Sequence, residues 1–239
     1  IALGTCAGLG TIMGPVMLQV FFPDQDPLSQ LTFSVIIGVI VTLAGINIIG
    51  IAGAMKANAL SEDEKKSAVK DFNFPKGILI ALLCGFMSGC FNIGLAFGED
   101  INFGALTPNE YKTLPATFLV TFGGFITNAA YCFYQNHKNQ TWSDYGKGNV
   151  FINNLLLCIL AGGLWYSQFF GLSIGKGFLV ESPTLMTLSF CILMALNVIF
   201  SNVWGIILKE WKGCPPRTIT VLIVGIIVLI ISCFLPQII

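Results

Sequence analysis

Residues 31–55 read LTFSVIIGVIVTLAGINIIGIAGAM, without a single Asp, Glu, Lys or Arg. A helix rises about 1.5 Å per residue, so about 20 apolar residues cross a hydrocarbon core about 30 Å thick. Six further uncharged runs have comparable length: 1–22, 77–98, 113–136, 148–175, 182–208 and 218–239. Every charged residue falls in the gaps between these seven runs. The sequence therefore predicts an all-α, polytopic membrane bundle with seven transmembrane helices.

The overall composition supports a membrane protein. Hydrophobic residues make up 55% of the chain and charged residues only 10%, and the mean hydropathy is +0.81. A membrane β-barrel would instead show short segments of alternating hydrophobicity. The formal net charge is zero, which gives no electrostatic reason to expect a nucleic-acid partner. The expected surroundings are a lipid bilayer.

The eight cysteines suggest packing rather than chemistry. Seven lie within apolar runs and only Cys214 lies in a gap, and none stands at zinc-ligand spacing from a histidine or another cysteine. No hydrolase, zinc-protease or nucleotide-binding motif occurs in the chain. We therefore expect no metal site, no cofactor and no enzymatic activity.

The distribution of lysine and arginine predicts the orientation of the helices. Ten of the twelve basic residues lie in three alternate gaps, 56–76, 137–147 and 209–217, whereas the others hold only Lys112 and Lys176. Loops rich in Lys and Arg remain in the cytoplasm. These three gaps are therefore predicted to be cytoplasmic, with the C-terminus outside.

The same charge pattern predicts an inverted repeat. The loop FPDQDPLSQ (22–30) has no basic residue, whereas KEWKGCPPR (209–217) is basic. The first and last helix pairs would then have opposite orientations, as inverted repeats of secondary transporters require. We interpret 1–55 as the last two helices of a first repeat, 56–76 as a cytoplasmic linker with a possible short surface helix, and 77–239 as a complete second five-helix repeat.

Uncharged polar residues recur along single faces of several predicted helices. An unpaired polar group in hydrocarbon costs several kcal/mol, so these faces should point into the bundle. Hydrogen bonding between helices is one interpretation, and a polar cavity is the other. Amides and aromatic faces suit an uncharged, polyhydroxylated solute, since no run holds a buried cation for an anion. The residues proposed to bind this solute are Asn92, Asn128, Trp165, Tyr166, Gln168 and Asn197.

Glu99 is the candidate for proton coupling. It stands beside Asp100 at the predicted outer end of the run 77–98. A carboxyl group that becomes buried gains affinity for a proton, which would couple solute movement to a proton gradient. If Glu99 has this role, the proton is the coupling ion. The alternative is that Glu99 is only the exposed start of a loop.

Several stretches resemble one bacterial transporter family. WYSQFF (165–170) and LKEW (208–211) are the most distinctive parts, and the glycine-rich stretches alone are weak. In chain order the stretches are GTIMGPVM (10–17), FNFPKGILIALLCGFMSG (72–89), LPATFLVTFGGFITNAAYCFY (114–134), AGGLWYSQFF (161–170), LKEWKG (208–213) and RTITVLIVG (217–225). Together they resemble the L-rhamnose–proton symporter family of the drug/metabolite transporter superfamily.

The resemblance implies ten helices in two inverted five-helix repeats, three of which would precede this chain. It also implies proton-driven uptake of L-rhamnose, or a similar deoxy sugar, across the bacterial inner membrane by alternating access. One alternative is transport of another small metabolite on the same scaffold, and a more distant one is a heptahelical receptor. The Gly-Glu-Asp at 98–100 matches no acidic pair of the family. The sequence leaves the oligomeric state open.

Overall fold

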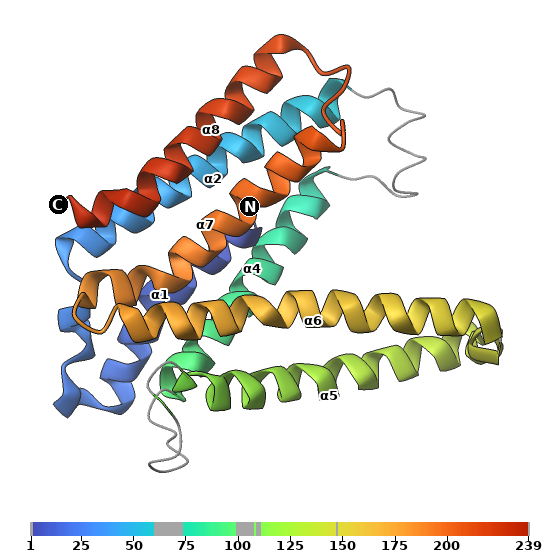
Figure 1. Ribbon diagram of the computed structural model, residues 1–239, viewed down its shortest axis with the longest axis horizontal. Helices are drawn as coiled ribbons and strands as arrows, with labels where there is room; N and C mark the ends of the chain where they lie inside the picture. Colours follow the sequence, from blue (N-terminus) through green and yellow to red (C-terminus); the bar gives the residue numbers. More distant parts are fainter. Residues whose placement is uncertain (1, 60–73, 99–107, 109–110, 147, 239) are drawn as a thin grey trace. The chain divides into compact units, whose positions relative to one another are not determined.

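The computed structural model describes residues 2–59, 74–98, 108, 111–146 and 148–238. These residues form seven long helices and no strand. All seven are long and apolar enough to cross a membrane, which confirms the predicted class. The helices are α1 (Ala2–Phe21), α2 (Phe33–Ala59), α4 (Phe74–Phe97), α5 (Leu114–Asn139), α6 (Gly148–Phe178), α7 (Pro183–Ile207) and α8 (Pro216–Phe234) (Figure 1).

Proline marks where several helices begin. Pro115, Pro183 and Pro216 occupy the first turns of α5, α7 and α8, where a missing N–H costs nothing. Between α1 and α2 the chain makes two short 3₁₀ turns, each opened by a proline. Pro15 lies inside α1, which continues through it. The helix ends agree with the uncharged runs to within a few residues.

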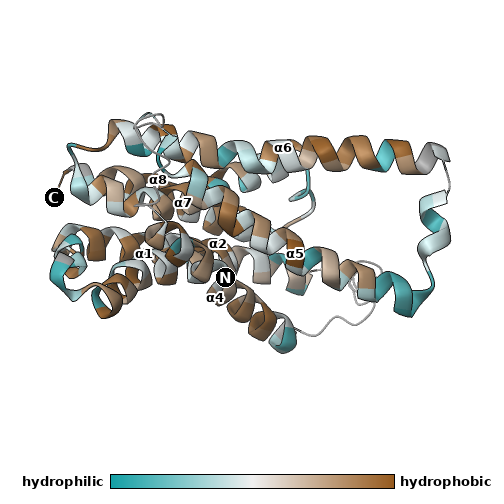
Figure 2. Ribbon diagram, turned by 90° about the horizontal axis from the view of Figure 1, so that it is seen from below, coloured by the Kyte–Doolittle hydropathy of each residue, from teal (hydrophilic) through white to brown (hydrophobic). Residues whose placement is uncertain are grey.

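The chain divides into two compact units. The first comprises Ile1–Phe97 and Leu179–Ile239, and therefore holds α1, α2, α4, α7 and α8. The second comprises Gly98–Phe178, with α5, α6 and the short 3₁₀ helix η4 (Trp142–Gly146) between them. Figure 2 shows hydrophobic residues along the lengths of the helices and hydrophilic residues gathered near their ends, as membrane-spanning helices require.

Within the first unit, α2 packs along α8 and α1 packs along α4, while α7 contacts α1, α2 and α8. A cluster of buried hydrophobic residues lies among α2, α7 and α8. It includes the fully buried side chains Ala52, Ala195, Leu222 and Leu229. Trp211, from the turn between α7 and α8, packs against this cluster.

The contact between α2 and α8 is made through glycine on both sides. A Cβ built on Gly45 would lie 2.7 Å from Cδ2 of Leu229, and one on Gly225 would lie 2.5 Å from Cγ1 of Ile49. Carbon atoms in contact normally stand about 3.5–4.0 Å apart, so only glycine fits at either position. As the contact advances from Gly45 to Ile49 in α2 it retreats from Leu229 to Gly225 in α8. The two helices therefore run antiparallel.

The contact between α1 and α4 is equally close but runs in the parallel sense. A Cβ on Gly85 would stand 2.5 Å from the carbonyl oxygen of Ala2, and one on Gly89 would stand 3.4 Å from Cβ of Leu9. Because position rises together in both helices, α1 and α4 point the same way. The Gly85-x3-Gly89 spacing is thus used for the backbone approach that small residues permit in membranes.

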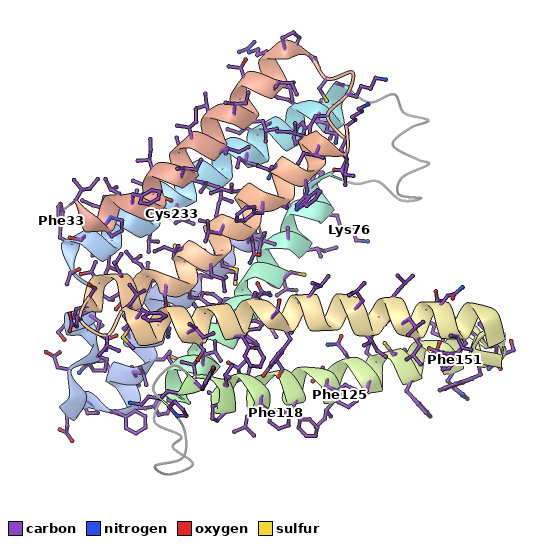
Figure 3. All side chains as sticks on the ribbon, in the orientation of Figure 1. Phe33, Lys76, Phe118, Phe125, Phe151 and Cys233 are labelled. Carbon is purple, nitrogen blue, oxygen red and sulfur yellow. The ribbon has the colours of Figure 1, made fainter. Side chains whose placement is uncertain are left out.

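In the second unit, α5 and α6 are joined through η4. The ring of Trp142 packs edge-on against Phe133, with centroids 4.9 Å apart. In the most apolar 18-residue stretch of each helix, only 11% of the residues are buried in α5 and 6% in α6, against 44% in α1. Phe118 and Phe125 project from α5 on the side away from α6 (Figure 3). The apolar surface of this unit is therefore available to lipid or to other membrane helices.

Two predictions lie outside the described residues. They are the surface helix within the 56–76 linker, most of which falls in 60–73, and the placement of Glu99.

Candidate functional site

Most polar side chains within the helices bond to their own backbone. Thr42 donates to the carbonyl of Gly38 at 2.9 Å, and Asn128 donates to that of Gly124 at 2.9 Å. Ser, Thr and Asn can reach the carbonyl one turn back, which satisfies their donors without a second helix. An amide that donates in this way still has an oxygen free to accept from a solute hydroxyl.

Asn92 forms a hydrogen bond between helices. Its Nδ2 donates to the carbonyl oxygen of Gly10 across the α4–α1 contact, at 2.7 Å. Gly10 permits this approach, because a Cβ there would stand 3.1 Å from Cβ of Asn92 and 3.2 Å from Cε1 of Phe190. Gly10 is consequently the point where α4 and α7 both reach α1. The half-buried amide of Asn92 is tied into this junction.

One step along α1, three small polar residues meet in the packed interior. Thr11, Thr42 and Cys191 come from α1, α2 and α7, and each is at least 97% buried. The thiol of Cys191 lies near the hydroxyls of both threonines. Thr11 Oγ1 has no hydrogen-bond partner among the described residues. This interior layer is polar yet closed to solvent.

The candidate residues of α6 form an aromatic and amide group. Trp165 packs edge-on against Phe169, with centroids 5.1 Å apart, and Tyr166 packs against Phe170 at 5.5 Å. Gln168 donates from Nε2 to the carbonyl of Trp165 at 2.9 Å. Trp165 is 53% exposed and Gln168 is half-buried. An aromatic face beside an amide can bind a sugar ring through its C–H face and its hydroxyls.

The predicted residues are thus distributed over both units. Asn92 and Asn197 belong to α4 and α7 of the first unit, and Asn197 is half-buried. Asn128 belongs to α5 of the second unit, where it is exposed. Trp165, Tyr166 and Gln168 share α6 of that unit and are linked through contacts on the same helix.

Two cavities are lined by other residues. The first unit contains one of about 400 Å³ between α1, α2 and α4, with Thr5 and Asn47 among mainly apolar neighbours. The second unit has one of about 390 Å³ near η4, lined by Asn136, Tyr145 and Asn154, among others. Sequence reasoning did not select Thr5 or Asn47. Both are uncharged polar residues inside apolar runs, which is the signal that would have found them.

No group of three or more metal-ligating side chains occurs in the part of the chain that the structure describes.

Comparison with known proteins identifies the family of this chain. The family model described as L-rhamnose-proton symport protein matches residues 1–237. The chain belongs to this family. It is therefore a transporter of the bacterial inner membrane and not an enzyme, as the sequence resemblance predicted.

Relatives of known name agree with the family. The chain is 30% identical to an L-rhamnose-proton symporter of Klebsiella pneumoniae over 97% of its own length and 67% of that protein. It is 29% identical to the symporter of Salmonella typhi, over 96% and 67%, and 30% identical to that of Yersinia pestis, over 97% and 67%. The chain thus spans about two thirds of these L-rhamnose-proton symporters. No solved structure matches it.

Proposed function

We propose that this protein takes up L-rhamnose, or a closely similar deoxy sugar, together with protons by alternating access. The observation that carries the proposal is the family match over residues 1–237. It is reinforced by relatives named L-rhamnose-proton symporter that align with 97% of the chain. The proton is the coupling ion, and a small neutral sugar is the substrate.

The chemistry of the helices supports a neutral solute. Apart from residues near helix ends such as Lys56 and Lys138, the helices carry amides, hydroxyls and aromatic rings rather than charges. A phosphorylated or anionic solute would require a cation within the membrane, which is costly and rare. L-Rhamnose combines hydroxyl groups with an apolar methyl group. Both amide and aromatic partners are therefore useful to it.

We assign the solute contacts to the six residues predicted from sequence. Asn92, Asn128, Gln168 and Asn197 would exchange hydrogen bonds with sugar hydroxyls, and Trp165 and Tyr166 would cover the apolar ring face. The aromatic cluster of α6 supports this role, since Phe169 and Phe170 hold the Trp165 and Tyr166 rings edge-on. Proton coupling is assigned to Glu99, for which burial in one transport state would raise proton affinity.

We also propose that 1–55 completes a first repeat, that 56–76 is the linker, and that 77–239 is the second repeat. The packing of the first unit supports this division. Gly225 follows Gly45 by 180 positions, and Leu229 follows Ile49 by the same interval. If positions 180 apart are equivalent, the contact of Gly45 with Leu229 and the contact of Gly225 with Ile49 are the same contact with the two antiparallel helices interchanged. An approximate two-fold axis in the membrane plane, which relates the repeats of such transporters, would produce this reciprocity.

The proposal is tested by uptake of radiolabelled L-rhamnose into vesicles that contain the full-length protein, under an imposed inward proton gradient. Accumulation that collapses with a protonophore is the expected result. Accumulation that persists without the proton gradient would overturn the coupling. If other neutral sugars accumulate and L-rhamnose does not, the substrate is wrong while the transporter remains. Glu99→Gln should abolish accumulation above equilibrium and preserve exchange of labelled for unlabelled sugar.

A further inference from the structure

The turn between α7 and α8 is a compact, hydrogen-bonded structure at the end of α2 (Figure 1). The backbone N–H of Glu210 donates to the carbonyl of Gly205 at 2.9 Å, and that of Lys212 donates to Lys209 at 3.0 Å. Lys209 adopts a left-handed conformation, with φ of 61°, and Gly213 has φ of 87°. These conformations reverse the chain within a few residues. The side chains of the turn therefore leave the backbone from fixed positions.

Trp211 anchors this turn to the helices. Its half-buried indole packs against the buried cluster of α2, α7 and α8. The indole Nε1 and the carboxylate oxygen Oε2 of Glu210 both lie 3.2 Å from the place a Cβ on Gly205 would take. The ammonium group of Lys56, in the last turn of α2, lies 4.7 Å from the centre of the Trp211 ring. This cation–π contact brings a basic residue of α2 to the turn.

The result is a concentration of positive charge, which we call the basic turn: Lys56, Lys209, Lys212 and Arg217. Glu210 is the one acidic residue within it. Lys209, Lys212 and Arg217 are exposed. Arg217 stands in the first turn of α8, where no acidic residue opposes it and the helix dipole adds positive potential. The basic turn joins the ends of three membrane-spanning helices, so it lies at the boundary between hydrocarbon and water.

We propose that the basic turn binds the phosphate headgroup of an anionic phospholipid in the cytoplasmic leaflet. The guanidinium of Arg217 can hold two phosphate oxygens at once, and the lysines add point charges. Trp211 has the amphipathic side chain that membrane proteins place at headgroup level. Anionic lipids of this leaflet attract basic residues next to membrane helices. The orientation predicted from the lysine distribution places this turn on that side.

A lipid, rather than a free anion, fits the position of these groups. Lys209, Lys212 and Arg217 are all exposed at the adjoining ends of α7 and α8. A free phosphate there would be held only by charges screened over about 8–10 Å. A phospholipid is held at that depth by its acyl chains. Lipid binding at the basic turn is independent of which solute the protein transports.

The test counts lipids bound to the full-length protein by native mass spectrometry in mixed micelles of phosphatidylglycerol and phosphatidylcholine. The variant Lys209→Gln/Lys212→Gln/Arg217→Gln removes three charges from the basic turn. The matched control, Lys65→Gln/Lys66→Gln/Lys70→Gln, removes three charges from the predicted cytoplasmic linker. We expect the first variant to lose at least about tenfold in phosphatidylglycerol binding, because basic residues at the membrane surface attract anionic lipids, and the control to lose less than twofold.

Other arms separate the possible outcomes. Equal losses in both variants would overturn the inference, because any cytoplasmic lysines would then serve. Displacement of the lipid by millimolar inorganic phosphate would also overturn it and would indicate a site for a free anion. Trp211→Ala should weaken binding severalfold, with Trp204→Ala as its control. Gel-filtration elution and helix content check that each variant is folded.

Discussion

Gly45 of α2 lies against Leu229 of α8. Four residues further along α2 the roles of the two helices are reversed, and the large side chain of Ile49 in α2 lies against Gly225 in α8. Each glycine accepts the large side chain that follows the other glycine by one turn. Two isolated glycines, without any motif around them, therefore determine how closely α2 and α8 pack. Close packing of this kind replaces the hydrophobic effect as the source of helix association in lipid.

Replacing Gly225 with alanine should destabilise the protein. The new Cβ would stand 2.5 Å from Cγ1 of Ile49 and 3.1 Å from its backbone nitrogen, and overpacking of this kind costs about 1–3 kcal/mol. Gly53→Ala is the control, because nothing lies within 4 Å of that site in α2 and alanine favours a helix by about 1 kcal/mol over glycine. Thermal unfolding in detergent, followed by circular dichroism, should lower Tm for the first variant only. Equal Tm values would contradict the close approach.

Asn92→Ala should weaken the junction of α1 and α4. It removes the 2.7 Å bond to Gly10, and a single hydrogen bond between membrane helices contributes about 0.5–1.5 kcal/mol. Asn202→Ala is matched to it, since Asn202 donates to Val198 of its own helix at 2.8 Å. Unfolding in denaturing detergent should show a loss of stability for Asn92→Ala and almost none for Asn202→Ala. The reverse order would mean that the interhelical bond contributes nothing.

Trp165→Ala should raise KM for L-rhamnose. An aromatic face contributes about 0.5–1.5 kcal/mol beyond its buried area, so a rise of roughly threefold to tenfold is expected, with the maximal rate nearly unchanged. Trp165→Phe keeps an aromatic face and should restore most of the affinity. Trp142→Ala, which changes the Trp142–Phe133 contact beside η4, is the control. Initial uptake rates over a range of sugar concentrations measure both constants. An effect of Trp142→Ala as large as that of Trp165→Ala would remove the specific role.

Cys214 offers a test of orientation. It is half-exposed in the turn between α7 and α8, whereas the other cysteines lie in membrane-spanning helices. A membrane-impermeant maleimide should label the protein in inside-out vesicles and leave it unlabelled in intact cells. Cys214→Ser should remove the labelling. Labelling in intact cells would place the turn outside and reverse the predicted topology.

The number and limits of the membrane-spanning helices in the described part of the chain could be predicted from sequence because the bilayer imposes them. Charges are expelled to the ends of spans, so the run 31–55 is sufficient to find α2. The small disagreements have a physical reason as well. α2 continues past Lys56 to Ala59, and α5 past Lys138 to Asn139, since a long aliphatic stem lets a lysine reach water from within a helix end.

The contacts between helices were less predictable. The Gly85-x3-Gly89 spacing is typical of close packing between membrane helices, and both glycines do contact α1. Gly45 and Gly225 carried no such signal, because a single glycine in an apolar helix has the same appearance whether or not a partner covers it. Polar stripes have a similar ambiguity. Asn92 and Asn128 both follow a helical face, yet one bonds to another helix and the other to its own, so their roles toward solute stay predictions.

The reciprocal glycine contact also has a consequence for inheritance. A bulkier residue at position 45 is tolerated only if the residue at position 229 becomes smaller. The same steric constraint links position 225 to position 49. Substitutions on α2 should therefore be accompanied by compensating substitutions on α8, far away in the gene. Among members of the family these four positions should covary as two pairs, because the residues of each pair are in contact.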